Sequence, residues 1–243
     1  MAGHSQFANI KHRKNAQDAK RAKLFTKLVR EVLVAAAQGL PEPENNPRLR
    51  YALQNARRAG VPKDRLAAAI QKGAGETGAG ADWSEMRYEG YAPGGVAVMV
   101  EALTDNKNRT AAEVRSAFTK AGGNLGETGS VAFLFDHIGV FAYDASACKE
   151  EAAFEAAIEC GADNMEAEDG KYVFTCSADE FIAVRDALSE KLGEYESADM
   201  VWAPQNPIAV DKEQAEKIAK LVDMLDESDD VQNVYAAYEY TDE

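Results

Sequence analysis

Apolar residues recur every three or four positions through the first third of the chain, which is the period of an amphipathic helix. Three segments have this pattern, 16–38, 46–60 and 62–73, and a glycine closes or follows each of them. Asn46 and Pro47 supply the N-cap and the first-turn proline of the second helix. Three helices with short connections predict a small helical bundle.

Beyond residue 82 the apolar pattern changes to that of β-strands. Residues 86–91 and 95–103 flank a Pro-Gly turn and predict a hairpin, and residues 130–135 predict a further strand. Thr110 and Glu113 have the spacing of a capping box, which predicts that a helix begins there. The expected order of this block is therefore strand, strand, helix, strand.

The residues from 138 onward have the order of a single βαββαβ unit. Strands are expected at 138–143, 164–168, 171–175 and 195–202, and helices at 147–160 and 178–192. Between the second and third of these strands, Asp169-Gly170 is a strong hairpin signal. This order of elements is typical of the ferredoxin-like fold.

The last predicted helix (211–225) and strand (231–238) cannot bury their apolar faces alone, and the earlier strand block lacks partners. We therefore expect the end of the chain to return to that block, so that the βαββαβ unit is an insertion. The predicted fold class is α+β, with an N-terminal three-helix domain and two ferredoxin-like α/β domains, the third inserted into the second. The expected boundaries are a flexible basic arm at 1–14, a helical domain at 15–73, a linker at 74–81, a middle domain at 82–136 and 207–243, and the inserted domain at 137–206.

The glycine-rich segment after the third helix contains the spacing of a dinucleotide-binding motif. Gly73, Gly75 and Gly78 match G-x-G-x-x-G, but that motif needs a strand before it and a helix after it. Here a helix precedes the glycines and a further loop follows them. The segment is therefore interpreted as a flexible linker, and no cofactor is predicted.

Charge is divided unevenly along the chain. Residues 1–72 carry fifteen Lys and Arg against five Asp and Glu, whereas residues 73–243 carry twelve against thirty-six. The overall net charge of −14 thus hides a basic N-terminal part. Such segregation predicts one surface for a polyanion and a remainder that is kept away from it.

The basic residues of the N-terminal part predict a nucleic-acid-binding surface. Four cations of the first helix lie nearly opposite its apolar stripe and are expected to face outward. The residues before this helix are expected to form a mobile arm that orders on a phosphate backbone. The predicted nucleic-acid-binding residues are His4, Lys11, His12, Arg13, Lys14, Lys20, Arg21, Lys23, Lys27, Arg30, Lys107 and Arg109. Candidate extensions of this surface are Arg48, Arg50, Arg57, Arg58, Lys63 and Arg65.

The sequence lacks the motifs that usually mark an enzyme. It contains no nucleophile elbow, no phosphate-loop lysine and no cluster of metal ligands, so we expect no catalysis, no metal and no small-molecule substrate. Carboxylates are plentiful, but they stand mostly in runs expected to be exposed, such as Asp229-Asp230. The three cysteines form no Cys-x-x-Cys pair and suit a reducing compartment as buried or unreactive thiols. With no run of about eighteen apolar residues and no signal-peptide core, we expect a cytoplasmic protein without membrane contact.

Several blocks of the sequence resemble the YebC family. They include AGHSxxANIKHRK, NPRLRxAL, YEGYxPGGVAVMVEALTDN and GGNLGxxGSVAF, in register over essentially the whole chain and most densely in residues 2–135. Gln6 and Phe7 stand where the family usually has Lys and Trp. The resemblance implies three domains, a helical one and two of ferredoxin-like character. It also implies DNA binding in some members, and in others an association with ribosomes that assists the synthesis of difficult peptide sequences.

Two functions therefore remain open. The first is a DNA-binding transcriptional regulator that acts through the basic helical domain, and the second is a ribosome- or RNA-associated translation factor whose acidic domains contact basic ribosomal proteins. The second and third helices show no recognisable helix-turn-helix pattern, which counts against sequence-specific reading of the major groove. The segments TDNKNRT (104–110) and GGNLGETGS (122–130) are further candidate contacts, with a capped loop and a tight turn as their structural alternatives.

Overall fold

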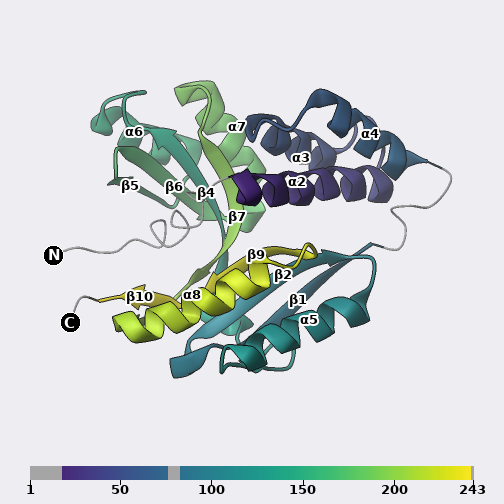
Figure 1. Ribbon diagram of the computed structural model, residues 1–243. Helices are drawn as coiled ribbons and strands as arrows, with labels where there is room; N and C mark the ends of the chain where they lie inside the picture. Colours follow the sequence, from purple (N-terminus) through teal and green to yellow (C-terminus); the bar gives the residue numbers. More distant parts are fainter. Residues whose placement is uncertain (1–17, 76–82, 242–243) are drawn as a thin grey trace. The chain divides into compact units, whose positions relative to one another are not determined.

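Helices and small β-sheets alternate in the computed structural model, which describes residues 18–75 and 83–241 (Figure 1). The fold class is α+β, as expected, with a helical bundle followed by two domains that each combine a sheet with helices. The chain divides into two compact units. One contains the bundle, the middle sheet and the chain from Asn206 onward, and the other is Phe135–Gln205.

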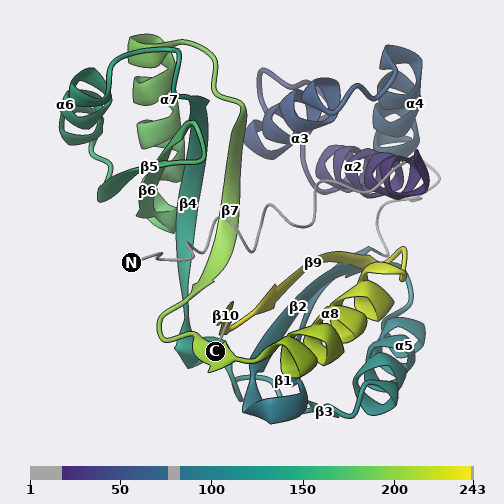
Figure 2. The ribbon, with the colours of Figure 1, turned by 60° about the vertical axis from the view of Figure 1, so that its left-hand side comes forward.

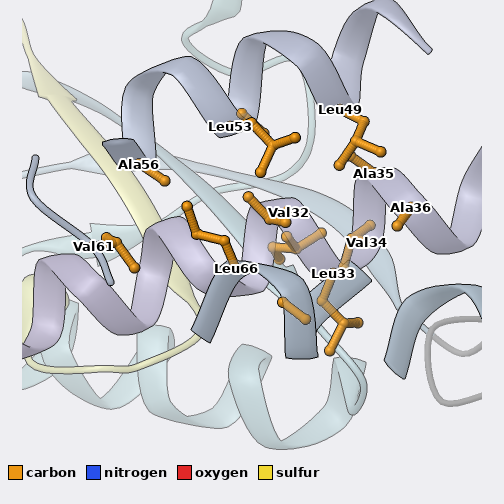
Figure 3. Packing of buried hydrophobic residues seen from close by; sticks show 13 residues of the cluster. Val32, Leu33, Val34, Ala35, Ala36, Leu49, Leu53, Ala56, Val61 and Leu66 are labelled. Carbon is orange, nitrogen blue, oxygen red and sulfur yellow. The ribbon is translucent and has the colours of Figure 1, made fainter. Parts of the chain in front are cut away.

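The helical bundle consists of α2 (Asp18–Gln38), α3 (Pro47–Arg58) and α4 (Lys63–Ala74). Its core combines the last turns of α2 with the apolar faces of the other two helices (Figure 3). The labelled side chains that pack there are Val32, Leu33, Val34, Ala35, Ala36, Leu49, Leu53, Ala56, Val61 and Leu66. Leu103 of the middle sheet belongs to the same buried cluster, so the bundle and that sheet share a core.

Asn46 begins α3 as expected and also ties it to the end of α2. Its Oδ1 accepts a hydrogen bond from the backbone N–H of Leu49 (3.0 Å), which is an N-cap. Its Nδ2 donates to the carbonyl oxygens of Ala35 (2.8 Å) and Leu40 (2.7 Å). One buried amide thus satisfies polar backbone groups at the end of one helix and at the start of the next.

The sequence predicted that the third helix ends at Gly73. In the structure Gly73 lies buried inside α4, which continues to Ala74. A Cβ atom at this position would stand 2.3 Å from the carbonyl oxygen of Leu33 in α2. The glycine is therefore required by the close approach of α2 and α4. The rest of the predicted linker lies almost wholly outside the described residues.

The middle domain is a four-stranded antiparallel sheet with the strand order β3-β1-β2-β9. Its strands are β1 (Ser84–Tyr91), β2 (Ala97–Thr104), β3 (Asn124–Leu125) and β9 (Val231–Ala236). Two helices, α5 (Lys107–Lys120) and α8 (Lys212–Asp226), cover one face of this sheet (Figure 2). Because β9 pairs with β2, the end of the chain returns to the earlier strands. Two further short strands, β8 (Ile208–Val210) and β10 (Tyr238–Tyr240), pair in parallel and form a separate two-stranded sheet.

The inserted unit has the order of elements that the sequence predicted. It contains β4 (Phe135–Asp144), α6 (Glu150–Cys160), β5 (Asn164–Glu168), β6 (Lys171–Ser177), α7 (Phe181–Leu192) and β7 (Ser197–Pro204). All neighbouring strands are antiparallel in the order β5-β6-β4-β7, the ferredoxin-like arrangement. Asp169 and Gly170 both have positive φ (49° and 76°), as expected for a tight hairpin turn.

Three further predicted features differ in the structure. The capping box is wrong, because α5 begins at Lys107 with Asn106 as its N-cap, and Thr110 lies buried inside the helix. Residues 130–135 are not a strand; Ala132–Leu134 form a 3₁₀ turn and β4 begins at Phe135. The helix expected at 147–160 begins only at Glu150.

Candidate nucleic-acid interface

The predicted basic arm lies outside the described residues, and with it His4, Lys11, His12, Arg13 and Lys14. Lys20 belongs to α2, but its side chain is not described either. The nucleic-acid contacts assigned to these residues stay predictions.

The sequence predicted that the basic side of α2 faces outward, and the structure contradicts this prediction. The basic side lies against residues 226–230 (Asp-Glu-Ser-Asp-Asp), the acidic segment, which ends α8 and leads into β9. Lys23 Nζ donates a hydrogen bond to the carbonyl oxygen of Glu227 (3.0 Å). Lys27 Nζ lies 3.5 Å from a carboxylate oxygen of Asp226. The helical pattern showed which side of α2 is basic, but it carried no information about a partner some 200 positions away.

Arg30 is the most enclosed of these cations. Its guanidinium donates hydrogen bonds to the carbonyl oxygen of Asp229 and to the carboxylate of Asp230. The same guanidinium lies over the ring of Trp83, 4.8 Å from its centroid, a cation–π contact. Its side chain is only 15% exposed. The geometry therefore fixes Arg30 between an aromatic ring and the acidic segment.

Asp230 connects α2 with the start of α5. Its Oδ2 accepts hydrogen bonds from Arg109 (2.7 Å), Thr110 (2.7 Å) and Thr104 (3.1 Å). Burial alone would raise the pKa of this carboxyl, but the hydrogen bonds from Arg109, Thr110 and Thr104 hold it below its usual range. Asp230 was expected to be exposed, and the structure buries it at the centre of a polar network.

The TDNKNRT segment is the capped loop that was weighed as its structural alternative. Asn106 Oδ1 accepts from the backbone N–H of Arg109 (3.1 Å). The Arg109 guanidinium bonds the carboxylates of Asp230 and Asp105, and these hydrogen bonds raise its pKa. Lys107 is exposed. Both Lys107 and Arg109 were predicted to contact nucleic acid. In the structure Arg109 is bonded to carboxylates, whereas the side chain of Lys107 is exposed to solvent.

The GGNLGETGS segment is also held by internal contacts. Buried Glu89 accepts hydrogen bonds from the backbone N–H groups of Val131 (2.9 Å) and Ala132 (2.8 Å). Burial would raise the pKa of this carboxyl, but backbone hydrogen bonds from the loop lower it below its ordinary value. A Cβ at Gly123 or Gly126 would stand 2.5 or 2.6 Å from neighbouring atoms. Tight folding of the turn therefore explains these two glycines without a ligand.

Cations accumulate in solvent on the other two helices of the bundle. Together α3 and α4 contain seven Lys and Arg and one acidic residue, Asp64. Six of the seven are exposed, namely Arg50, Arg57, Arg58, Lys63, Arg65 and Lys72; we call these the open cations. The seventh, Arg48, is partly buried and pairs with Glu31 (2.8 Å) and Glu85 (2.6 Å). Arg21 of α2 is exposed as well and lies over the ring of Phe25.

Two of the open cations flank a hollow in the surface of α3. Arg50 and Arg57 stand seven residues apart on one helix face, with Gln54 between them. The hollow has a volume of about 300 Å³, and Leu53 and Pro43 provide its apolar lining. Glu44 also lines the hollow, so a carboxylate stands there with the two guanidiniums, and the hollow by itself is not a phosphate site.

Three other features of the described part of the chain bear on function: its metal-ligating side chains, its apolar helices and its cysteines. No group of three or more His, Cys, Asp or Glu side chains there is placed to hold a metal ion. None of the described helices is long and apolar enough to cross a membrane. Cys176 is buried, and that burial raises the pKa of its thiol to about 11, while Cys148 and Cys160 are half-buried.

The fold and these surfaces define a class of protein: a basic helical domain combined with two largely acidic α/β domains, one inserted in the other. Two family models together match most of the chain. Residues 5–76 match the TACO1/YebC protein N-terminal domain, and residues 83–238 match the TACO1/YebC second and third domain. The chain belongs to the TACO1/YebC family. The model for the second and third domains carries a transcription-regulator label, which makes this a family of regulatory proteins.

A solved structure supports this assignment over nearly the full length. The chain is similar to a conserved hypothetical protein of Aquifex aeolicus, with 46% sequence identity and a TM-score of 0.86. The match covers 98% of each chain. Because the match covers nearly the whole chain, the likeness includes the helical bundle, the middle domain and the inserted unit.

Proposed function

We propose that this protein is a nucleic-acid-binding regulator of gene expression that contacts phosphates through its N-terminal helical domain. The observation that carries the proposal is the set of six open cations on α3 and α4, with a single acidic residue on the same two helices. Exposed Lys and Arg side chains that outnumber the acidic residues in this way bind a polyanion by releasing its counterions. The predicted basic arm adds further cations to this domain.

The transcription-regulator label of the family favours DNA as the target. A second candidate, an RNA- or ribosome-associated translation factor, is favoured by the charge of the inserted unit. Residues 135–205 contain seventeen Asp and Glu against four Lys and Arg. A domain this acidic is repelled by nucleic acid and attracted to basic proteins, which are abundant around ribosomal RNA.

The role of the open cations is tested by replacing Arg50, Arg57 and Arg65 together with Gln. Affinity for a labelled DNA duplex and for a labelled single-stranded RNA is then measured by fluorescence anisotropy. We expect the triple variant to bind at least about tenfold more weakly, because each lost phosphate contact removes electrostatic free energy. Gln preserves helix propensity, so the melting temperature is expected to change little.

A matched control removes three exposed cations from the middle domain, Arg115, Lys212 and Lys220, again by substitution with Gln. Net charge changes equally in the two variants. If the control lost as much affinity as the bundle variant, binding would depend on net charge and the proposed surface would be wrong.

The target is identified by ultraviolet crosslinking in cells followed by sequencing of the attached nucleic acid. Recovery of DNA from defined promoters supports the transcriptional role. Recovery of ribosomal RNA, together with sedimentation of the protein with ribosomes at low salt, supports the translational role.

A further inference from the structure

The three described cations on the basic side of α2 have the spacing of a phosphate-binding row. Lys23, Lys27 and Arg30 stand at positions i, i+4 and i+7, on one face of the helix. At 1.5 Å per residue this row extends over about 10 Å. A strand of duplex nucleic acid rises by about 3.4 Å along the helix axis for each phosphate and also winds around that axis, so a row of this length reaches more than one phosphate of a strand.

The acidic segment presents to this row the kind of atoms that a phosphate backbone would present. Lys23 and Arg30 bond the carbonyl oxygens of Glu227 and Asp229, and Lys27 and Arg30 face the carboxylates of Asp226 and Asp230. These carbonyls also lie at the C-terminal end of α8, where the helix dipole adds partial negative charge. The cations thus contact an intramolecular polyanion.

The negative charges of the acidic segment are unfavourable at the C-terminal end of a helix. The acidic segment places four carboxylates within five residues, where they repel one another and the negative end of α8. The cations of α2 offset that repulsion. Asp226 has 35% of its side chain exposed, so solvent partly screens its ion pair with Lys27.

We propose that residues 226–229 occupy a second phosphate-binding site, formed by Lys23 and Lys27 with Arg30 at its end, and that nucleic acid binds there by displacing these four residues. Asp230 stays in place, because Arg109, Thr104 and Thr110 hold its carboxylate. The open cations make the first contact with nucleic acid, and the site on α2 is added when residues 226–229 leave. This inference rests on the proposed function. It adds that a segment of the same chain competes with nucleic acid for the cations of α2.

The test removes two negative charges from the acidic segment by substitutions that keep the size of the side chains. The variant D226N/D229N keeps the buried Asp230, and affinity is measured with the same labelled DNA duplex and single-stranded RNA. We expect binding about threefold to tenfold tighter than that of the unmodified protein, because the variant weakens the ion pair of Asp226 with Lys27 and removes the nearby negative charge of Asp229. Adding K23Q and K27Q to this variant is expected to abolish the gain, because the gain acts through those two cations.

The control D163N/E194Q removes two exposed negative charges from the inserted unit and should not tighten binding. Equal affinities for D226N/D229N and this control would overturn the inference while leaving the proposed function intact. If the unmodified protein bound neither probe and D226N/D229N did not either, the proposed function itself would fail.

Hydrogen exchange of the unmodified full chain gives a second, independent readout. On addition of the duplex, we expect faster amide exchange in residues 227–229, because displacement of the acidic segment exposes its backbone. Unchanged or slower exchange in these residues on binding would show that the segment stays docked, which would overturn the inference.

Discussion

Asp230 shows most clearly how a single residue joins distant parts of the chain. Its carboxylate accepts from α2, from the end of β2 and from the start of α5, and its own carbonyl oxygen accepts from the backbone N–H of Leu103 (2.8 Å). No local sequence pattern indicates that Asp230 is buried and bonded to distant residues, because a run of acidic residues after a helix is usually solvated. The contacts that bury it come from positions 30, 104, 109 and 110.

Replacing Asp230 with Asn is expected to lower the free energy of unfolding near neutral pH by about 1.5–3 kcal/mol, the usual contribution of hydrogen bonds to a charged group. The folded-state pKa of Asp230 is lowered, so its contribution to stability is complete above the unfolded-state pKa of about 3.9 and is lost as the pH falls through the folded-state value. The difference between the two proteins should therefore shrink in acid. Urea denaturation between neutral pH and about pH 2 measures it, and a difference that stayed constant would contradict this account.

At the level of elements, the close contact of α2 and α4 depends on the absence of a side chain at Gly73. The change Gly73→Ala would improve helix propensity, but the added methyl group meets the Leu33 carbonyl and the Ala36 side chain. We expect a net destabilisation of about 1–3 kcal/mol, typical of overpacking. Gly75→Ala is the matched control, since Gly75 is exposed with a φ of −70° and should tolerate the change. A Gly73→Ala protein as stable as the control, in thermal melts, would place the helices further apart than described.

Several elements were predictable because their signals are local. The Asn46 cap, the Asp169-Gly170 turn and the amphipathic stripes each act within a few residues, and the structure contains all three. The wrong predictions arose where long-range contacts decide. Residues 130–135 have an apolar pattern typical of a strand, yet backbone bonds to buried Glu89 bend their first part into a turn. The strands β3 and β8 are too short to show any periodicity.

For the whole molecule, the sequence predicted the segregation of charge but not how the basic residues are used. It assigned the outward role to α2, whereas the structure places the acidic segment on α2 and leaves the open cations on α3 and α4. The reason is that helix periodicity identifies a polar side but cannot tell solvent from a charged partner elsewhere in the chain. The candidate interface was therefore partly predictable. Its domain and its charge were predicted, and five of the six open cations were candidate extensions of the surface; the contact of α2 with the acidic segment was not predicted.

If the open cations contact phosphates, the affinity for DNA must depend on salt, and the steepness of that dependence counts the contacts. For a duplex, the slope of log K against log salt changes by about 0.9 for each phosphate contact. The R50Q/R57Q/R65Q variant should therefore show a slope shallower by about 2.7 than that of the unmodified protein if each arginine neutralises one phosphate. The R115Q/K212Q/K220Q control should keep the original slope. Equal slopes for the unmodified protein and the bundle variant, or an affinity that did not respond to salt at all, would contradict the account.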